Sequence, residues 1–423
     1  MRAPEIRPIV IAAGGTGGHF YPAEALAGAL IERGHRVVLM TDARTVVPPG
    51  TVFDQRNQYV LPGAGIAGRG MVRAGKAVFA LAAGVVRARG IMARIRPAAV
   101  VAFGGYPSVP PVLAARLLRG RPPVILHEQN AVLGRANRFL ARHASVLALS
   151  FANTTRVPPK VHRVLTGNPV RPAVTALSQA GYEAPTAARH DGSIQGGSIR
   201  LLVLGGSLGA RVFSDIVPGA LASLSMSLQA RLQVTQQCRA EDLERVRTVY
   251  ASSEITAEMA PFFSDVADRL RTAHMVIARA GASTVAELAI AGRPSILVPL
   301  PAAIDDHQNA NARALADAGG TWVMPQSDFT VEALLDRLGS LLRDPGALAQ
   351  LAAGARSVAR PEAAEALADV VEHAIGETER VGIDRAPGRR AGSEQSQDGQ
   401  GRIRPDQSRV GQSRVGQLRV VQS

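Results

Sequence analysis

The chain has 423 residues, more than one hydrophobic core usually supports, so we expect two domains. Apolar residues make up 46% and charged residues 19%, a balance that excludes collagen-like, coiled-coil and wholly disordered proteins. The net charge of +14 calls for an anionic partner, and the single cysteine, Cys238, excludes an intrachain disulfide framework. Met1–Pro8 has mixed charge, unlike a signal peptide, and the longest apolar run, Ala77–Val86, is half of what a bilayer requires.

The first half of the chain alternates apolar runs with helical spacing. Ile6–Ala13 is a short continuous apolar run, typical of a buried parallel strand, and Pro22–Glu32 has the spacing of a helix. Further strands are predicted at 36–40, 98–103 and 124–127. Such alternation predicts a doubly wound α/β domain with a parallel sheet.

The second half repeats this plan. A strand is predicted at Arg200–Leu204, a helix at Ile216–Leu224, and further strands at Met275–Ala278 and Ser295–Val298. We therefore predict two Rossmann-like domains, an N-terminal one at 1–170 and a C-terminal one at 200–378, joined by a hinge and linker at 171–199. A crossing of the last helix back to the first domain is the alternative for the end of the second. Residues 379–423 contain few apolar side chains and repeat Gln-Ser-Arg-Val-Gly, so we expect them to be disordered.

A glycine-rich turn follows the first predicted strand of each half. These turns are Gly14-Gly15-Thr16-Gly17-Gly18-His19 and Gly205-Gly206-Ser207-Leu208-Gly209. A glycine turn before a helix offers free backbone N–H groups and a positive dipole end, which suit a phosphate. Neither turn has the dinucleotide or Walker A spacing, which disfavours a nicotinamide enzyme or a P-loop kinase. Tight packing of strand on helix would require the same glycines.

Two polar residues stand at the same predicted edge of the second sheet. Glu287 lies about one turn into a helix that follows Met275–Ala278, where a carboxylate can accept both hydroxyls of a ribose. An acid near a helix start also complements the dipole without any ligand. Gln308 follows Ser295–Val298, and an amide suits sugar hydroxyls because it both donates and accepts.

The segment between Gln55 and His127 contains eleven Lys and Arg residues and no Asp or Glu. Its four aromatic residues are too few and too scattered for base stacking, so we expect an anionic surface and no nucleic acid as partner. Apolar residues among the cations make a basic amphipathic stretch, although a solvated basic face over ordinary core is the alternative. The expected membrane patch comprises Val72, Lys76, Val78, Phe79 and Leu81.

Seven motifs together resemble the MurG family of glycosyltransferases, which complete the lipid-linked precursor of peptidoglycan. Besides the two glycine turns, they are Gly104-Gly105-Tyr106-Pro107-Ser108, His127-Glu128-Gln129-Asn130, Gly167-Asn168-Pro169-Val170-Arg171, Arg279-Ala280-Gly281-Ala282-Ser283-Thr284, and Gln308 in its loop. The resemblance covers most of the chain from Ile6 to about Gly376.

The resemblance implies the glycosyltransferase B fold, with two domains facing across a cleft. It implies an inverting enzyme that moves GlcNAc from UDP-GlcNAc to the 4-hydroxyl of MurNAc in undecaprenyl-diphospho-MurNAc-pentapeptide (lipid I), giving lipid II. It also implies a peripheral enzyme at the cytoplasmic face of the inner membrane, with cell-wall synthesis and division proteins as possible partners. No cofactor or metal is expected, since the chain has no Asp-x-Asp clasp.

The resemblance also implies roles for individual residues. Ser207 and Arg171 hold the diphosphate, Glu287 binds the ribose, and Phe263 offers its backbone to the uracil. Contacts to the sugar and its surroundings are expected from Ala282, Ser283, Thr284, Gln308 and Asn130, and donor closure from Thr16, Gly17 and Gly18. The turn at Gly104, Gly105 and Tyr106 is expected to hold the acceptor diphosphate, because a glycine turn offers free backbone N–H groups to a phosphate.

A general base must accept the proton of the attacking hydroxyl. His19 at the end of the first glycine turn is the expected base, and bracing of that turn is its alternative role. Glu128 is the rival base, although its carboxylate could equally orient Asn130.

Three other functions share some of the sequence features described above. They are a related enzyme with another lipid acceptor, a UDP-GlcNAc 2-epimerase, and a nucleic-acid-binding protein.

Overall fold

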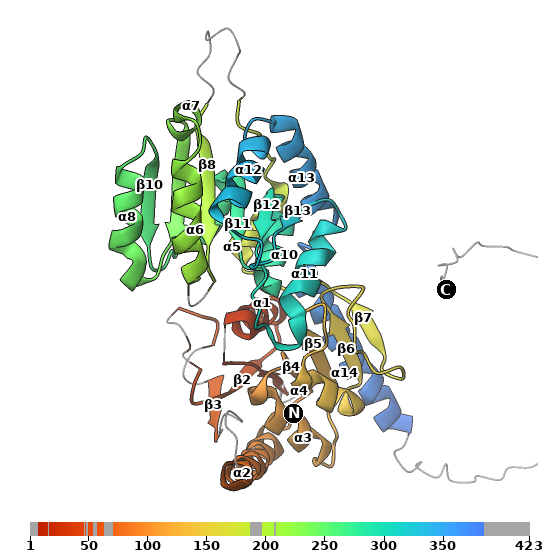
Figure 1. Ribbon diagram of the computed structural model, residues 1–423. Helices are drawn as coiled ribbons and strands as arrows, with labels where there is room; N and C mark the ends of the chain where they lie inside the picture. Colours follow the sequence, from red (N-terminus) through yellow and green to blue (C-terminus); the bar gives the residue numbers. More distant parts are fainter. Residues whose placement is uncertain are drawn as a thin grey trace, which may run out of the picture. The chain divides into compact units, whose positions relative to one another are not determined.

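The computed structural model describes residues 7–15, 17–45, 47, 50–53, 57–62, 71–186, 197–206 and 209–384, without the side chains of 71–77 and 381–384. Two parallel β-sheets with helices on their faces make up this part of the chain (Figure 1). Thr16, Ser207 and residues 385–423 lie outside the described residues, as do the side chains of Val72 and Lys76.

The first sheet is formed by the N-terminal half of the chain. Its described strands are β1 (Ile9–Ala12), β2 (Val37–Asp42), β3 (Gln58–Leu61), β4 (Ala99–Ala102), β5 (Val124–Glu128), β6 (Val146–Leu149) and β7 (Arg163–Leu165). They are parallel and lie in the order β3-β2-β1-β4-β5-β6-β7. The chain reverses its direction of travel across the sheet between β1 and β4, and ligands of such sheets bind beyond the strand ends at that point.

Helices cover both faces of the first sheet. They are α1 (Gly17–Glu32), α2 (Met71–Ile95), η2 (Tyr106–Ser108), α3 (Val109–Arg116), α4 (Arg135–Leu140) and η3 (Ala141–His143). Alternate residues of β1 face opposite ways: Ile9 and Ile11 pack with α1, whereas Val10 and Ala12 pack with α2 and α3. Burial on both faces explains the continuous apolar strands of this sheet.

The second sheet repeats the arrangement. Its described strands are β8 (Ile199–Leu204), β9 (Leu232–Gln237), β10 (Thr256–Ala260), β11 (Met275–Ala278), β12 (Ser295–Leu297) and β13 (Thr321–Val323). They are parallel in the order β10-β9-β8-β11-β12-β13, so the reversal lies between β8 and β11.

The second half contains most of the helices. These are α5 (Pro172–Thr175), η4 (Ala176–Gln179), α6 (Arg211–Ala222), α7 (Met226–Gln229), η5 (Ala240–Asp242), α8 (Leu243–Ala251), α9 (Val266–Thr272), α10 (Ala282–Ala291), η6 (Ile304–Asp306), α11 (His307–Ala316), α12 (Val331–Leu341), α13 (Pro345–Ser357) and α14 (Ala363–Asp384). Helices α6, α8 and α12 pack over one face of the sheet, and α10 and α11 over the other.

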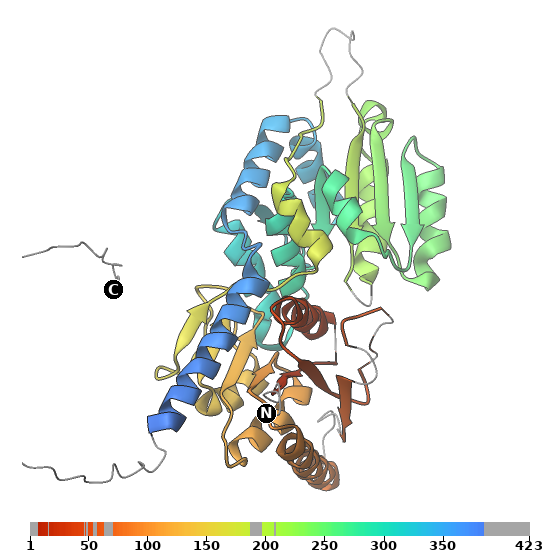
Figure 2. The same cartoon turned by 180° about the vertical axis from the view of Figure 1, so that it is seen from behind.

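The last helix, α14, returns to the first sheet. Leu367, Val371 and Ala374 are buried in the same core cluster as Ile9 and Ile11 of β1. Figure 2 shows α14 in blue running along the N-terminal half of the chain. The core of the first domain is therefore completed by a helix that lies more than 300 positions after β1 in the sequence.

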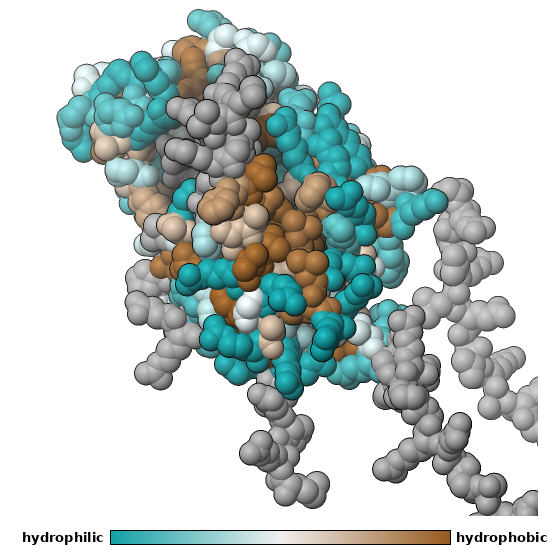
Figure 3. Space-filling model, turned by 90° about the horizontal axis from the view of Figure 1, so that it is seen from below, coloured by the Kyte–Doolittle hydropathy of each residue, from teal (hydrophilic) through white to brown (hydrophobic). Residues whose placement is uncertain are grey.

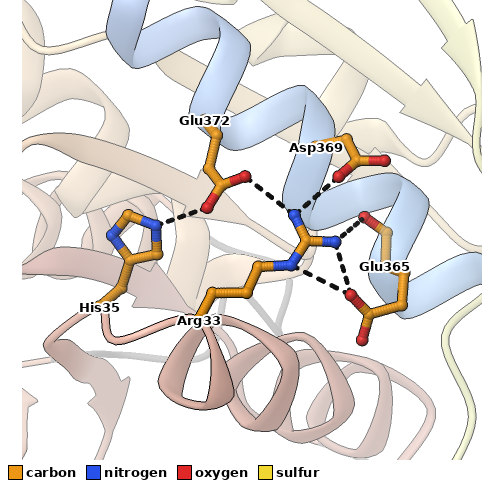
Figure 4. Close-up of polar contacts among 5 residues, drawn as sticks. All are labelled: Arg33, His35, Glu365, Asp369 and Glu372. Atoms are coloured by element: carbon orange, nitrogen blue, oxygen red, sulfur yellow. Dashed lines mark hydrogen bonds and ion pairs between the residues drawn. The ribbon is translucent and has the colours of Figure 1, made fainter.

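Arg33, just after α1, and His35 hold α14 by its polar side (Figure 4). The Arg33 guanidinium donates to Glu365 at 2.5 Å, Asp369 at 2.7 Å and Glu372 at 2.9 Å, and His35 Nε2 lies 2.7 Å from the other oxygen of Glu372. The three acids come from successive turns of one helix face, so a single arginine engages them all. We call this group the α14 clasp.

The predicted strands all form, with ends that differ by at most a few residues. Two helices begin earlier than predicted: α1 at Gly17 instead of Pro22, and α6 at Arg211 instead of Ile216. Their first turns mix the apolar Phe20, Val212 and Phe213 with glycine, polar or charged residues, so no regular apolar spacing reveals them. Helix α14 extends to Asp384, so residues 379–384 are helical and were wrongly assigned to a disordered tail.

Candidate active site

The glycine turns after β1 and β4 lie side by side, because these strands are neighbours at the reversal point of the first sheet. Gly15, Gly104 and Gly105 have φ values of 86°, 83° and 67°, which only glycine adopts without strain. A Cβ on Gly14 would come within 2.4 Å of the Thr41 and Thr45 hydroxyl oxygens. Positive φ values thus require glycine in both turns, and at Gly14 the backbone also lies too close to its surroundings for a side chain.

His19 lies in the first turn of α1, between these two glycine turns. Its Nδ1 lies 2.9 Å from Oε1 of Gln129, which follows β5. A Cβ on Gly105 would be 3.5 Å from Nε2 of His19, so the imidazole lies directly against the second turn. The structure therefore brings together the expected base and the expected cradle for the acceptor diphosphate.

Glu128 is buried at the end of β5, and both of its oxygens are occupied. One oxygen accepts the backbone and side-chain N–H groups of Asn130 at 3.0 and 3.1 Å. The other accepts the backbone N–H of Gly134 and the amide of Asn137, each at 2.9 Å. A carboxylate has about four acceptor positions, so none is left for a substrate proton. This geometry favours a role in orienting Asn130 over a role as base.

Asn130 links the two halves of the chain through Asn311 of α11. The Asn311 amide donates to Oδ1 of Asn130 and to the carbonyl of Ala280, both at 3.1 Å, and its Oδ1 accepts the N–H of Ala131 at 2.8 Å. Asn311 is completely buried. No sequence motif pointed to Asn311, although it lies one helical turn after Gln308.

The expected sugar-binding residues begin α10. Gly281 precedes the helix and has no side chain that could cap its first N–H groups. Ala282, Ser283 and Thr284 form the first turn, and the buried hydroxyl of Ser283 has no partner among the described residues. Gln308 lies in α11, where its Oε1 accepts the N–H of Leu300 at 2.9 Å. Free N–H groups at a helix start favour an anion or sugar oxygens.

Gln237 at the end of β9 is a second residue that the sequence analysis missed. Its Oε1 accepts the N–H of Gly205 at 3.0 Å, and its Nε2 donates to the carbonyls of Gly206 at 3.0 Å and Pro261 at 3.1 Å. One amide thus joins the second glycine turn to the loop that contains Phe263. Phe263 is buried, with the Arg269 guanidinium 4.2 Å from its ring centroid.

Arg171 lies at the hinge, immediately before α5. Its guanidinium donates to Glu287 of α10 at 3.2 Å and lies 5.2 Å from the centroid of the Tyr21 ring on α1. Burial raises the pKa of Glu287, and the positive charge of Arg171 opposes that rise. The residue expected to bind the diphosphate, Arg171, and the residue expected to bind the ribose, Glu287, therefore contact each other directly.

Comparison with known proteins decides the family. Residues 9–148 match the glycosyltransferase family 28 N-terminal domain, and residues 200–369 match its C-terminal domain. A relative from Granulibacter bethesdensis is 58% identical over 87% of this chain and 94% of its own length. It is a UDP-N-acetylglucosamine–N-acetylmuramyl-(pentapeptide) pyrophosphoryl-undecaprenol N-acetylglucosamine transferase. The chain belongs to the MurG family.

Two further similarities agree with this family. A transferase of the same description from Gluconobacter oxydans is 53% identical over 87% of this chain and 99% of its own length. The crystal structure of MurG from Acinetobacter baumannii is 32% identical, with a TM-score of 0.67 over 87% of this chain and 99% of that one. The predicted fold, two Rossmann-like domains in the glycosyltransferase B arrangement, is confirmed.

Two of the apolar residues expected in the membrane patch are exposed on α2. Val78 and Phe79 are 68% and 77% exposed, and Val86, which the prediction omitted, is 71% exposed. Leu81 was assigned to the same surface but packs against the core, because it lies two residues from Phe79 and so about 200° around the helix. Figure 3 shows apolar residues gathered on the face of this MurG-family chain seen from below. No helix in the described ranges is long and apolar enough to span a bilayer.

Proposed function

We propose that the chain transfers GlcNAc from UDP-GlcNAc to the 4-hydroxyl of MurNAc in undecaprenyl-diphospho-MurNAc-pentapeptide. The observation that carries this proposal is the 58% identity, over nearly the whole relative, to a transferase described by that reaction. The product is the β-1,4-linked disaccharide on the same lipid carrier. Because the donor is α-linked, a single displacement with inversion at the anomeric carbon accounts for the product.

The donor binds to the second domain in this proposal. The uncapped first turn of α10 offers N–H groups to the sugar and its neighbouring phosphate, and Arg171 supplies a positive charge beside them. Glu287 accepts the ribose hydroxyls, and the loop that Gln237 anchors offers the backbone at Phe263 to the uracil. As the bond between the anomeric carbon and UDP breaks, Arg171 and the helix dipole stabilise the charge on the departing diphosphate. This arrangement needs no metal ion, so turnover should survive chelation by EDTA.

His19 is the proposed base. The 4-hydroxyl loses its proton to the imidazole while its oxygen attacks the anomeric carbon, and UDP leaves with the bonding electrons. The position of His19 against the Gly104–Gly105 turn supports this role, since that turn is the proposed cradle of the acceptor diphosphate. Positioned bases contribute roughly 10²–10⁴-fold, so His19→Ala should lower kcat by that factor and leave the Kd for UDP-GlcNAc nearly unchanged.

The acceptor is a membrane lipid, and α2 is the proposed contact with the membrane surface. Val78, Phe79 and Val86 are exposed on this helix, and Arg87, Arg89 and Arg94 are exposed near its end. Apolar side chains enter the boundary between headgroups and acyl chains, and each cation adds about 1 kcal/mol against anionic lipid. The protein would then work as a peripheral enzyme beside other proteins of cell-wall synthesis and division.

The decisive experiment mixes the purified chain with UDP-GlcNAc, with and without a soluble lipid I analogue. UDP release and the disaccharide product are both measured. We expect UDP release to depend on the acceptor and to give a β-1,4-linked product. UDP-GlcNAc binding without transfer would reject this acceptor and favour another lipid acceptor, whereas conversion of UDP-GlcNAc alone would favour epimerase chemistry.

A further inference from the structure

A chain of three side chains connects the first turn of α1 to the junction between the domains. His19 Nδ1 lies 2.9 Å from Gln129 Oε1, and Gln129 Nε2 lies 2.9 Å from His127 Nδ1. His127 Nε2 lies 3.0 Å from the carbonyl oxygen of Gly167, in the segment that leads into the second domain. His127 and Gln129 are buried, so protein partners must satisfy their polar atoms.

The Gly167 carbonyl fixes the far end of this chain. A carbonyl oxygen only accepts, so His127 must carry a proton on Nε2. Burial lowers the pKa of His127 to about 4, and the ring is therefore neutral near pH 7. A neutral imidazole has one N–H, which leaves Nδ1 of His127 as an acceptor for the Gln129 amide.

A second carbonyl fixes the orientation of Gln129. Its Nε2 donates to the backbone carbonyl of His127 at 3.2 Å as well as to His127 Nδ1. Turning the amide over would set its oxygen against two acceptors and would break both bonds. Oε1 of Gln129 must therefore face His19, and an amide oxygen only accepts.

We infer that Gln129 is a positioning residue that holds His19 as the Nδ1–H tautomer, with the lone pair of Nε2 free to take the substrate's proton. This inference rests on the proposed role of His19 as base. When the 4-hydroxyl transfers its proton to Nε2, His19 becomes an imidazolium whose Nδ1–H remains on Gln129 Oε1. Gln129 stays neutral and takes no proton. Nε2 is also the nitrogen that lies beside Gly105, where the acceptor diphosphate is proposed to bind.

The tautomer can be observed without any substrate. Long-range ¹H–¹⁵N correlation spectra of protein with ¹⁵N-labelled histidine distinguish protonated from unprotonated ring nitrogens. The His19→Gln variant identifies the His19 signals by their loss. We expect a protonated Nδ1 and an unprotonated Nε2 for neutral His19 in the wild type. A protonated Nε2 would overturn the inference, whatever the outcome of the transfer assay.

Gln129→Met tests the cause, because methionine has similar length and no amide. We expect the His19 proton to lose its fixed place on Nδ1 and kcat to fall at least about 10-fold, while KM for UDP-GlcNAc changes less than 3-fold. The loss should not exceed the roughly 10²–10⁴-fold contribution of a positioned base. An unchanged His19 tautomer in a folded Gln129→Met protein would reject the role of Gln129.

Gln229→Met is the matched control. Gln229 is also a buried glutamine, and its amide donates to the carbonyls of Ala222 and Leu224 at 2.8 and 2.7 Å in the second domain. The same substitution there should lower the stability and leave kcat and the His19 tautomer unchanged. Equal losses of kcat in the two variants would mean that Gln129 acts through stability alone. If the wild type has the expected tautomer but transfers no GlcNAc, the proposed function fails and the tautomer result stands.

Discussion

Arg171 and Glu287, expected to bind different parts of the donor, contact each other at 3.2 Å. Burial raises the pKa of Glu287, and the adjacent guanidinium favours its ionised form. The pair also joins the hinge to α10, because Arg171 lies just before α5. A ribose and a diphosphate bound here would therefore meet an acceptor and a cation that are already in position.

Glu287→Ala should remove recognition of the ribose hydroxyls. A hydrogen bond to a charged group contributes about 1.5–3 kcal/mol, so we expect the Kd for UDP to rise roughly 10- to 150-fold. Calorimetry with UDP and with 2′-deoxy-UDP measures the specific contact. The wild type should bind UDP more tightly than the deoxy analogue, and Glu287→Ala should bind the two equally.

Glu332→Ala is the control for that experiment, since Glu332 is an exposed glutamate in the first turn of α12 in the same domain. It should leave both dissociation constants unchanged. If Glu287→Ala still distinguishes UDP from 2′-deoxy-UDP, Glu287 does not bind the ribose and its contact with Arg171 has a structural role.

The sequence predicted seven of the thirteen described strands, most of which are buried on two faces and so leave continuous apolar runs. It missed the partly exposed edge strands β3, β7, β10 and β13, because their residues mix apolar and polar side chains without a continuous run. It predicted neither Asn311 nor Gln237, because a single buried amide produces no periodic pattern. Their partners lie in other segments of the chain, and only the fold brings them together. For Glu128 the sequence left two roles open, a base or a partner of Asn130, and only the fold shows the four N–H groups that its carboxylate accepts.

Glu128→Gln should reduce stability more than it affects the chemistry. The new NH₂ group would face N–H donors of Asn130, Gly134 or Asn137, and at least two buried donors would lose their acceptor. An unsatisfied buried donor costs about 1–3 kcal/mol, which denaturant unfolding would measure. A kcat loss of 100-fold or more with unchanged stability would instead identify Glu128 as the base.

The α14 clasp should weaken in acid. The hydrogen bond from His35 and the charge of Arg33 lower the pKa of Glu372 from its usual value of 4.5. A lowered pKa in the folded state stabilises the protein above the unfolded value, and this contribution disappears as the pH falls through the folded value. The difference in unfolding free energy between wild type and Glu372→Gln should therefore be present above about pH 4.5 and shrink as the pH falls below that value.

Glu377→Gln supplies the comparison on the same helix. Glu377 forms a pair with His373 at 3.3 Å in which both side chains are largely exposed, and such pairs contribute little. We expect Glu377→Gln to match the wild type from pH 7 to pH 4. An equal effect of the two substitutions would mean that the general charge of α14, and not the α14 clasp, sets the pH dependence.

Phe79→Ser should weaken binding to membranes without affecting the chemistry. Phe79 is 77% exposed on α2, and burying a large apolar side chain contributes about 1.5–3 kcal/mol. Sedimentation with vesicles that contain anionic lipid should show roughly 10- to 150-fold weaker binding. Added salt should weaken the wild type further, because the exposed arginines of α2 interact with the lipid charge.

Met226→Ser is the matched substitution in the second domain, where Met226 of α7 is 71% exposed. It should leave vesicle binding unchanged, and both variants should turn over the soluble lipid I analogue at the wild-type rate. Equal losses of vesicle binding would mean that the lipid contact extends beyond α2. A slower rate for Phe79→Ser with the soluble analogue would instead place α2 in contact with the acceptor itself, because no membrane is present in that assay.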